Sequence, residues 1–452
     1  MNETNEQAGA PNPGNQSEAA LSQSQGAMGE SKAGNGEKVG AQPPLDPLTP
    51  VQRSERFEML DVLRGFAILG ILMPNIQTFS MISVAYSNPL AYGNFEGANF
   101  FVWLATQMLF EQKFMTLFSM MFGAGILLMS QRAEQKGQTG LWKVHYRRMA
   151  WMLLFGLLHA HIFWYGDILF TYAVGGCVVY WLRRLPPVWL TAIGIVMNAV
   201  GSLAIVGIGL LVINLVPEDA LEEMRKAWLP PQELVQQEVD AYRGGWLSQA
   251  AYRSLLSLQI QLMMVPMMLF WRTAGLMLIG MALFKWGFIT GQAKTRNYLI
   301  AIAVAIMVAW PAIGAELAHS YSTQWEFPNS QFFGTQVNYW VAPLVSLAYM
   351  SIIALICRFG VLGILANALK SVGQMAFTNY LMQTVICTTI FYGHGFGWYG
   401  HLERIEQFGV VLAVWAFQLV VSPIWMSQFR YGPAEWVWRS LTYWKRQPFL
   451  RD

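Results

Sequence analysis

The stretch that decides the fold is residues 58–83, EMLDVLRGFAILGILMPNIQTFSMIS. Its charged side chains all fall in the first seven residues, and an uncharged, mostly apolar run follows. A helix of about 20 such residues crosses the roughly 30 Å hydrocarbon core of a bilayer. The whole chain has a matching composition, with 54% hydrophobic and only 12% charged residues. Soluble domains carry about 25% charged residues, so the sequence predicts a membrane protein.

Further apolar stretches follow the first, each long enough to span a bilayer. The predicted fold is therefore all-α, a polytopic membrane helix bundle of about ten transmembrane helices. The second and sixth stretches exceed a simple span, so we expect them to be tilted, broken or partly interfacial. The predicted spans are 58–83, 98–130, 146–164, 167–183, 188–216, 256–289, 297–318, 333–357, 371–393 and 405–429.

The N-terminal segment has a different composition. Residues 1–52 are rich in Gly, Ser, Gln, Asn, Ala and Pro and contain no aromatic residue. Such a segment buries too little surface to offset its ordering entropy. It also lacks the apolar core and cleavage site of a signal peptide. We expect a disordered cytoplasmic tail over 1–52 and a transmembrane helical domain over 53–452.

Basic residues alternate between the loops. The loops after spans two, four, six, eight and ten are basic, whereas 84–97 and 319–332 contain no Lys or Arg and 217–253 is net acidic. The positive-inside rule then places both termini in the cytoplasm, with an even number of spans. The 217–253 segment is predicted to be an outer-side amphipathic helix on the membrane, or a lid over an outward-facing site.

Composition also excludes several kinds of partner. The net charge is only +3, which argues against nucleic-acid binding. Cys177, Cys357 and Cys387 lie in apolar stretches far from metal-ligand spacing, so we interpret them as small buried residues and expect no metal site. The sequence has no Walker loop, Rossmann glycine run, nucleophile elbow or haem motif, and no tightly bound cofactor is predicted.

Charged and amide side chains inside the spans are the candidate functional residues. Asp61 and Arg64 are three residues apart, share a helix face and can pair, although a helix-start acid with a snorkelling arginine would give the same pattern. Asn75 lies about three turns further along roughly that face. Its partner is either a neighbouring helix or a substrate.

Span two carries Glu111 and Lys113, which are two residues apart and so cannot face each other on one helix. At least one of them needs a partner elsewhere. Arg272 in span six also needs a counter-ion or an anionic ligand.

Two histidines and an aspartate meet at the junction of spans three and four. His159 and His161 point to different helix faces, so one helix cannot offer both to a single ion. Asp167 is either the cap of the next helix or the partner of a histidine base. We predict His159 and Asp167 as catalytic residues.

Span nine carries a polar stripe that includes Gln374, Thr378, Asn379 and Gln383. Such a stripe lines either a polar cavity or a helix interface.

Several separated motifs resemble the YeiB-like bacterial membrane proteins. They are MLDVLRGFAILGIL at 59–72 with Asn75-Ile76, KFMTLFS at 113–119 with Phe122-Gly123-Ala124-Gly125, and His159 followed by Tyr165-Gly166-Asp167. They continue with GQMA at 373–376, TNY at 378–380, IFYG at 390–393 and GPAEWVWR at 432–439. The likeness covers essentially all of 54–452. Members of that family have been labelled transporters.

The first span is also similar to that of the transmembrane acyltransferase superfamily, whose members use cytosolic acyl-CoA to acylate sugars across the membrane. The Asp, Arg-Gly and Asn of that span match Asp61, Arg64-Gly65 and Asn75. The histidine that follows in the superfamily has no counterpart, because residues 76–98 contain no His. His159 is the candidate base instead.

The resemblance implies an acyltransferase that uses acyl-CoA as co-substrate and acylates a glycan or lipid acceptor on the outer side of the lipid bilayer. The predicted substrate-binding residues are Asp61, Arg64, Asn75, Lys113, Arg147, Arg148, Asn379 and Gln383. A small-molecule transporter that uses the same polar groups, or a purely structural membrane protein, is the alternative. The sequence gives no oligomeric state.

Overall fold

A computed structural model describes residues 58–137 and 139–451. The predicted all-α class is confirmed, because the described residues form helices with one isolated antiparallel bridge, between Phe429 and Leu450. The predicted tail over 1–52 and the start of the transmembrane domain at 53–57 lie outside the described residues.

Helices occupy all ten predicted spans. Among the described residues, 7 helices are long and apolar enough to cross a membrane. They cover spans one, two, five, six, seven, eight and ten, at Glu58–Ser80, Gly97–Gln135, Pro187–Leu215, Trp246–Lys285, Thr295–Ser322, Ser330–Phe359 and Arg404–Gln428. The other three predicted spans are short or broken: α5 Leu141–Leu158 with η4 His159–Phe163, α6 Leu169–Leu182, and α15 Gly363–Gln374 with α16 Ala376–Phe391.

The two overlong spans are interrupted, as their length predicted. In the second, the π-helical turn η3 Thr106–Phe110 separates α3 Gly97–Ala105 from α4 Lys113–Gln135, and Gln112 has a φ of 62°. In the sixth, the π-helical η5 Ile260–Leu269 contains Pro266 and joins α10 Trp246–Gln259 to α11 Phe270–Lys285. A proline ring removes one backbone donor and widens the turn before it.

The remaining elements are α1 Glu58–Gly70, α2 Leu72–Ser80, η2 Ser83–Tyr86, α7 Pro187–Leu215, α8 Glu218–Trp228, α9 Gln232–Arg243, α12 Thr295–Val304, η6 Ala305–Ala309, α13 Trp310–Ser322, η7 Ser330–Gly334, α14 Thr335–Phe359, α17 Arg404–Gln428 and α18 Pro433–Tyr443.

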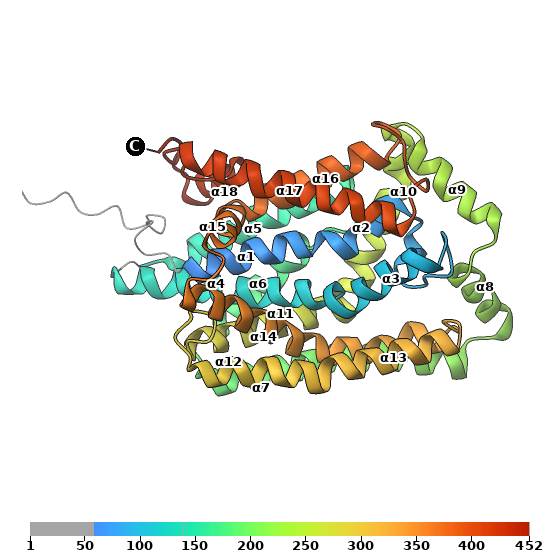
Figure 1. Ribbon diagram of the computed structural model, residues 1–452, viewed down its shortest axis with the longest axis horizontal. Coiled ribbons are helices and arrows are strands. Elements are labelled where there is room, and N and C mark those ends of the chain that lie inside the picture. The colour runs from blue at the N-terminus through green and yellow to red at the C-terminus, as the bar shows by residue number, and fades with distance from the viewer. Residues whose placement is uncertain (1–57, 138, 452) are drawn as a thin grey trace, which may run out of the picture. The chain divides into compact units, whose positions relative to one another are not determined.

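Helix α11 lies inside the bundle, and α4, α6 and α7 pack around it (Figure 1). Its crossings depend on glycine. A Cβ on Gly123 of α4 would lie 2.0 Å from the Met277 carbonyl oxygen, and one on Gly280 would lie 1.9 Å from that of Met120. On the α7 side, Gly194 and Gly275 face each other in the same way. Helices in lipid commonly associate through such close backbone contacts at small residues.

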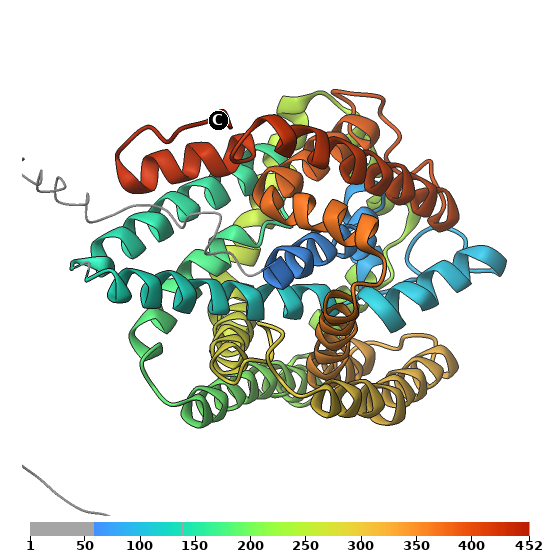
Figure 2. The same ribbon diagram turned by 60° about the vertical axis from the view of Figure 1, so that its left-hand side comes forward.

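A second close crossing joins α1 to α15. A Cβ on Gly65 would lie 1.9 Å from the Leu369 carbonyl oxygen, and one on Gly373 would lie 1.8 Å from that of Asp61. The view turned by 60° shows α1 enclosed by the surrounding helices (Figure 2). Much of the first span is accordingly buried, including Leu63, Ala67 and Ile68.

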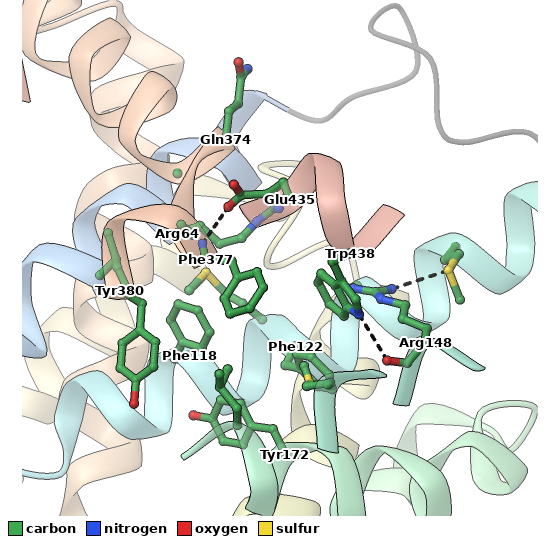
Figure 3. A pocket seen from close by; sticks show the side chains of 18 of the residues that line it. Arg64, Phe118, Phe122, Arg148, Tyr172, Gln374, Phe377, Tyr380, Glu435 and Trp438 are labelled. Atoms are coloured by element: carbon green, nitrogen blue, oxygen red, sulfur yellow. Dashed lines mark hydrogen bonds between the residues drawn. The ribbon is translucent and has the colours of Figure 1, made fainter. Parts of the chain in front are cut away.

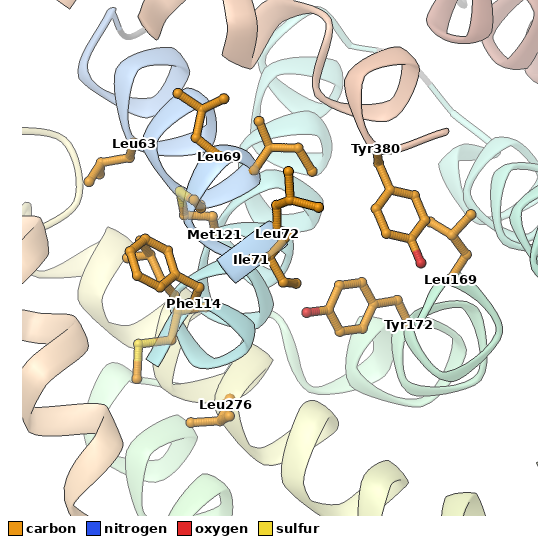
Figure 4. Close-up of a cluster of buried hydrophobic side chains, with 14 of the residues drawn as sticks. Leu63, Leu69, Ile71, Leu72, Phe114, Met121, Leu169, Tyr172, Leu276 and Tyr380 are labelled. Atoms are coloured by element: carbon orange, nitrogen blue, oxygen red, sulfur yellow. The ribbon is translucent and has the colours of Figure 1, made fainter. Parts of the chain in front are cut away.

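The apolar core lies between α1, α4, α6 and α16. Figure 4 shows side chains from these helices meeting in its centre, with the Tyr172 and Tyr380 rings on one side. Phe114 packs against Phe66 with ring centroids 5.1 Å apart. This part of the core thus includes the hydroxyl groups of Tyr172 and Tyr380 among apolar side chains.

The acidic 217–253 segment forms α8 and α9 and the start of α10. These helices lie across the end of the bundle opposite to the one where α1 begins (Figure 1). Trp228 donates from Nε1 to the Trp325 carbonyl at 2.7 Å, and Asn88 donates to the Trp228 carbonyl at 3.0 Å. Glu238 accepts from the Ser83 amide at 2.7 Å, and burial raises the pKa of this carboxyl. Of the two predicted arrangements, the packing matches a cover over the bundle end.

The glycine crossings give a stability prediction. Gly123→Ala should lower the free energy of unfolding by about 1–3 kcal/mol, because the new methyl group overlaps backbone that cannot move alone. Gly207→Ala in α7 is the control, since a Cβ there meets nothing within 4 Å. Thermal unfolding in detergent measures both. Equal melting temperatures for the two variants would contradict the close-packing account.

Candidate functional site

A cavity of about 240 Å³ opens at the end of the bundle where α1 begins (Figure 3). Helices α1, α4, α5, α6, α15, α16 and α18 contribute its walls. Four arginines lie around it, namely Arg64, Arg132, Arg148 and Arg439. By the loop charges, this end is the predicted cytoplasmic side.

The predicted pair of Asp61 and Arg64 forms at the cavity. Arg64 Nη2 donates to Asp61 Oδ1 at 2.7 Å, and Gln374 Nε2 donates to Asp61 Oδ2 at 3.2 Å. Asp61 is buried, whereas the Arg64 side chain is 40% exposed. Asp61 therefore holds one edge of the guanidinium while the rest of it faces the opening.

Arg148 is the second arginine placed for anion binding. Its guanidinium lies 4.5 Å from the centre of the Trp438 ring, and Nη1 contacts the Met129 sulfur at 3.4 Å. The charges of Arg439 and Arg64 lie close enough to repel it. Three neighbouring guanidiniums attract a group with several negative charges, such as a phosphate.

Apolar side chains line the cavity from this rim inward. Phe118, Met121, Met152 and Phe377 form part of its wall, and Tyr172 and Tyr380 lie at its inner part (Figure 3). The Tyr172 hydroxyl is bonded to Ser119 at 3.0 Å. A narrow apolar passage of this kind favours a thin, mostly uncharged chain over a folded nucleotide.

The two predicted catalytic residues meet beside the inner part of the cavity. His159 Nδ1 and Asp167 Oδ2 are 2.8 Å apart, and His159 Nε2 lies 3.0 Å from the Thr384 hydroxyl. Asp167 also accepts the Phe170 amide at 2.9 Å, so it contacts both the start of the next helix and the histidine. With Asp167 ionised, Nδ1 carries the hydrogen and Nε2 keeps a lone pair.

Position along the chain explains how this pair arises. His159 begins the π-helical turn η4 after α5, and the tight turn at 164–168 brings Asp167 back beside it. The Tyr380 ring packs against the His159 ring with centroids 5.1 Å apart. Since Tyr380 lines the cavity, the histidine lies one side chain away from it. His161 points elsewhere, toward Gln261 Oε1 at 3.2 Å, as the helix period predicted.

Thr384 and Glu435 are two site residues that the sequence analysis missed. Thr384 lies one turn after Tyr380, and that spacing was its only signal. Glu435 of α18 accepts the Phe377 amide at 2.6 Å, the Thr378 amide at 3.1 Å and the Thr378 hydroxyl at 2.5 Å. It thereby caps the start of α16 from another helix. Burial raises the pKa of this carboxyl, and its hydrogen bonds oppose that change.

Five of the eight predicted binding residues do not line the cavity, and Asn75, Lys113 and Arg147 are three of them. Asn75 makes no side-chain hydrogen bond within the described residues, and Arg147 points away with a buried Nε. Lys113 is fully buried and donates to Asn338 Oδ1 at 2.8 Å. Arg272 lies near it, stacked on Tyr339 at 3.8 Å.

Two residues of the polar stripe of span nine, Asn379 and Gln383, lie against α17. Asn379 donates to Ser422 at 3.1 Å, and Gln383 donates to Gln418 at 3.0 Å and to the Ile68 carbonyl at 2.9 Å. Of the two alternatives for this stripe, the helix interface accounts for these bonds. Asn379 and Gln383 do not line the cavity.

Comparison with known proteins gives relatives over nearly the full chain. The family described as "Protein of unknown function (DUF418)" matches residues 283–445. The uncharacterized protein YeiB of Escherichia coli is 32% identical over 402 residues, which cover 86% of this chain and 96% of that protein. The uncharacterized protein YxaH of Bacillus subtilis is 30% identical over 421 residues, covering 90% and 99%. No solved structure matches.

The cap on α16 gives a second stability prediction. Glu435→Ala leaves two buried backbone amides and one hydroxyl without their acceptor, so we expect a loss of about 2–3 kcal/mol. Glu218→Ala, which removes an exposed ion pair with Arg225, should change stability by less than about 1 kcal/mol. Thermal unfolding of both variants in detergent is the measurement. A Glu435→Ala protein as stable as Glu218→Ala would refute the capping role.

Proposed function

This chain belongs to the YeiB-like (DUF418) family, and we propose that it is an acyltransferase of the bacterial inner membrane. In this proposal, a short acyl group passes from cytoplasmic acyl-CoA to an acceptor on the outer side. The observation that carries it is the cavity that begins among arginines and ends at Tyr380, beside the His159–Asp167 pair.

The arginine rim suits the phosphates of coenzyme A. Arg64 and Arg148 have guanidinium groups that no carboxylate fully neutralises, and charge-assisted bonds to phosphate are strong. Asp61 and Gln374 would hold Arg64 in place. Arg148 lies eleven residues before His159 along α5, which is about 16 Å of helix rise. That separation suits a pantetheine arm better than direct contact between the nucleotide and the histidine.

Cavity size favours a short acyl group. A volume of about 240 Å³ is below the roughly 300–1,000 Å³ of pockets that enclose whole small molecules. The nucleotide would therefore stay at the open rim, with only the arm and its acyl group inside. We expect acetyl-CoA and propionyl-CoA to be used in preference to long-chain acyl-CoA.

His159 would act as general base. Its Nε2 lone pair, now directed at the Thr384 hydroxyl, would take the proton of an acceptor hydroxyl. The acceptor oxygen then attacks the thioester carbonyl, the C–S bond breaks, and the imidazolium returns the proton to the leaving thiolate. Asp167 is a positioning residue, since it fixes the tautomer and stabilises the imidazolium.

Transport is the second candidate, and the charges in span two favour it. Lys113 lies fully buried, with Glu111 and Arg272 close enough to interact with it electrostatically. Such interior charges often mark an ion or proton pathway. A transporter, however, would not require an arginine-rimmed cavity that leads to a histidine base.

The test is calorimetric binding of an acyl-CoA series to detergent-purified protein, followed by transfer assays. Arg64→Ala and Arg148→Ala should each weaken binding about 10-fold or more, because each removes a charged donor worth about 1.5–3 kcal/mol. His159→Gln should spare binding and lower the transfer rate by about 10²–10⁴-fold.

Arg184→Ala is the matched control, because Arg184 is a basic residue of another predicted cytoplasmic loop, 76% exposed and outside the cavity. It should leave binding unchanged. Absence of acyl-CoA binding at every chain length, in protein that still melts cooperatively, would rule out acyl transfer and favour transport.

A further inference from the structure

Arg253 is a buried cation to which the described part of the chain offers no acidic partner. Its side chain is fully buried in the middle of α10, where Nε donates to the His161 carbonyl at 2.9 Å. Its two terminal nitrogens have no hydrogen-bond partner, and it forms no ion pair within residues 58–137 and 139–451. Burying a charge in this way costs several kcal/mol unless an anion neutralises it. The described residues therefore leave the charge of this arginine without a counter-ion.

Two buried tyrosine hydroxyls also lack a hydrogen-bond partner among the described residues. Tyr242 of α9 and Tyr392, which follows α16, are fully buried, and the described residues offer neither hydroxyl a partner. Both interact electrostatically with Arg253. Their rings pack 4.9 Å apart, and Tyr242 also stacks on Tyr399 at 4.5 Å. Three unused groups able to donate, all within one cluster, would suit an anionic oxygen group.

Glu238, a carboxylate that contacts this tyrosine cluster, is already engaged. Glu238 accepts from the Ser83 amide, the Ser83 hydroxyl and the Tyr399 hydroxyl, at 2.7, 3.3 and 3.1 Å. Glu238 is thus bonded to Ser83 and Tyr399, and among the described residues it forms no ion pair with Arg253. An anion from outside the chain is therefore the group that would complete the cluster.

This cluster is joined to the candidate base. Ser257 of α10 donates to the Ala160 carbonyl at 2.9 Å, and with Arg253 it binds α10 to the turn that carries His159. Trp164 packs near the candidate base. Its ring is 6.2 Å from that of His159, and its buried Nε1 also lacks a partner among the described residues.

Access comes from the bundle end opposite to the arginine rim. His394 is exposed, and its ring lies 5.9 Å from that of Tyr392. Burial and the charge of Arg253 lower the pKa of His394, so the arginine acts on a residue at the surface. The cluster thus lies about one side chain below that surface.

We propose that Arg253, Tyr242 and Tyr392 bind an anionic group, a phosphate or a carboxylate, on the acceptor molecule. The inference rests on the proposed function and specifies its acceptor as an anionic polyol. Its charge is held by Arg253 while one hydroxyl reaches toward His159. A neutral sugar or glycerol would leave the guanidinium unpaired and would bind poorly.

The test uses the full chain in detergent without acyl-CoA, so that it is independent of acyl transfer. Calorimetry compares glycerol 1-phosphate and glucuronate with glycerol and glucose. At least one of the two anions should bind saturably, and both neutral molecules should bind at least 10-fold more weakly. The anion that binds identifies the acceptor's charged group as a phosphate or a carboxylate.

Two variants assign the binding to this cluster. Arg253→Met should weaken anion binding at least 10-fold, and Tyr392→Phe, which removes a hydroxyl that the fold does not use, should weaken it several-fold without lowering the melting temperature. Arg225→Met, on the exposed face of α8, is the control and should bind as the wild type does.

Anion binding that is equal in Tyr392→Phe and wild type, or no saturable anion binding by folded wild-type protein, would overturn this proposal. Acyl-CoA binding measured on the same preparations separates the two proposals. A protein that binds acyl-CoA and no anion would keep the acyltransferase and lose the anionic acceptor.

Discussion

Close backbone contact between helices is the constraint on which the rest of this structure depends. In lipid, apolar side chains gain little by leaving their surroundings, so helices associate through packing and hydrogen bonds. Gly123 and Gly280 let α4 and α11 touch, and Gly65 and Gly373 do the same for α1 and α15. These two crossings fix the helices on either side of the cavity. They thereby fix the positions of α1, α4 and α15, which carry part of the cavity wall.

The α1–α15 crossing also creates the polar end of the cavity. Because Gly373 lies directly against the Asp61 carbonyl, Gln374 can reach the Asp61 side chain and help to hold Arg64. Span nine then breaks at Met375, and Glu435 caps the new helix start. The break lets α16 begin inside the bundle, so that Tyr380 lines the cavity and Thr384 reaches His159.

Periodicity and charge alone gave the class, the helix positions and the local pairs. The contact between His159 and Asp167 follows from one tight turn, and that between Asp61 and Arg64 from one helix turn, so both were accessible from sequence. Contacts between helices that are distant in the sequence could not be predicted in this way. The Thr384 hydroxyl lies 225 residues from His159, and Glu435 lies 57 residues from Thr378. Helix period tells which face a residue occupies, but not which helix faces it, and so the stripe of span nine stayed ambiguous.

The distribution of charged side chains distinguishes the two ends of the bundle from its middle. Arginines that lack full neutralisation lie at both ends, around Arg148 at one and at Arg253 at the other, while the base between them is a histidine paired with Asp167. A buried cation without a counter-ion weakens a fold that an apolar residue of the same size would strengthen, so packing alone does not explain Arg253. In the proposed function, two anionic molecules would approach from opposite sides and meet near the histidine base. An acyl donor and an anionic acceptor have that arrangement, whereas a single transported solute would leave one of the two arginine sites without a ligand at any time.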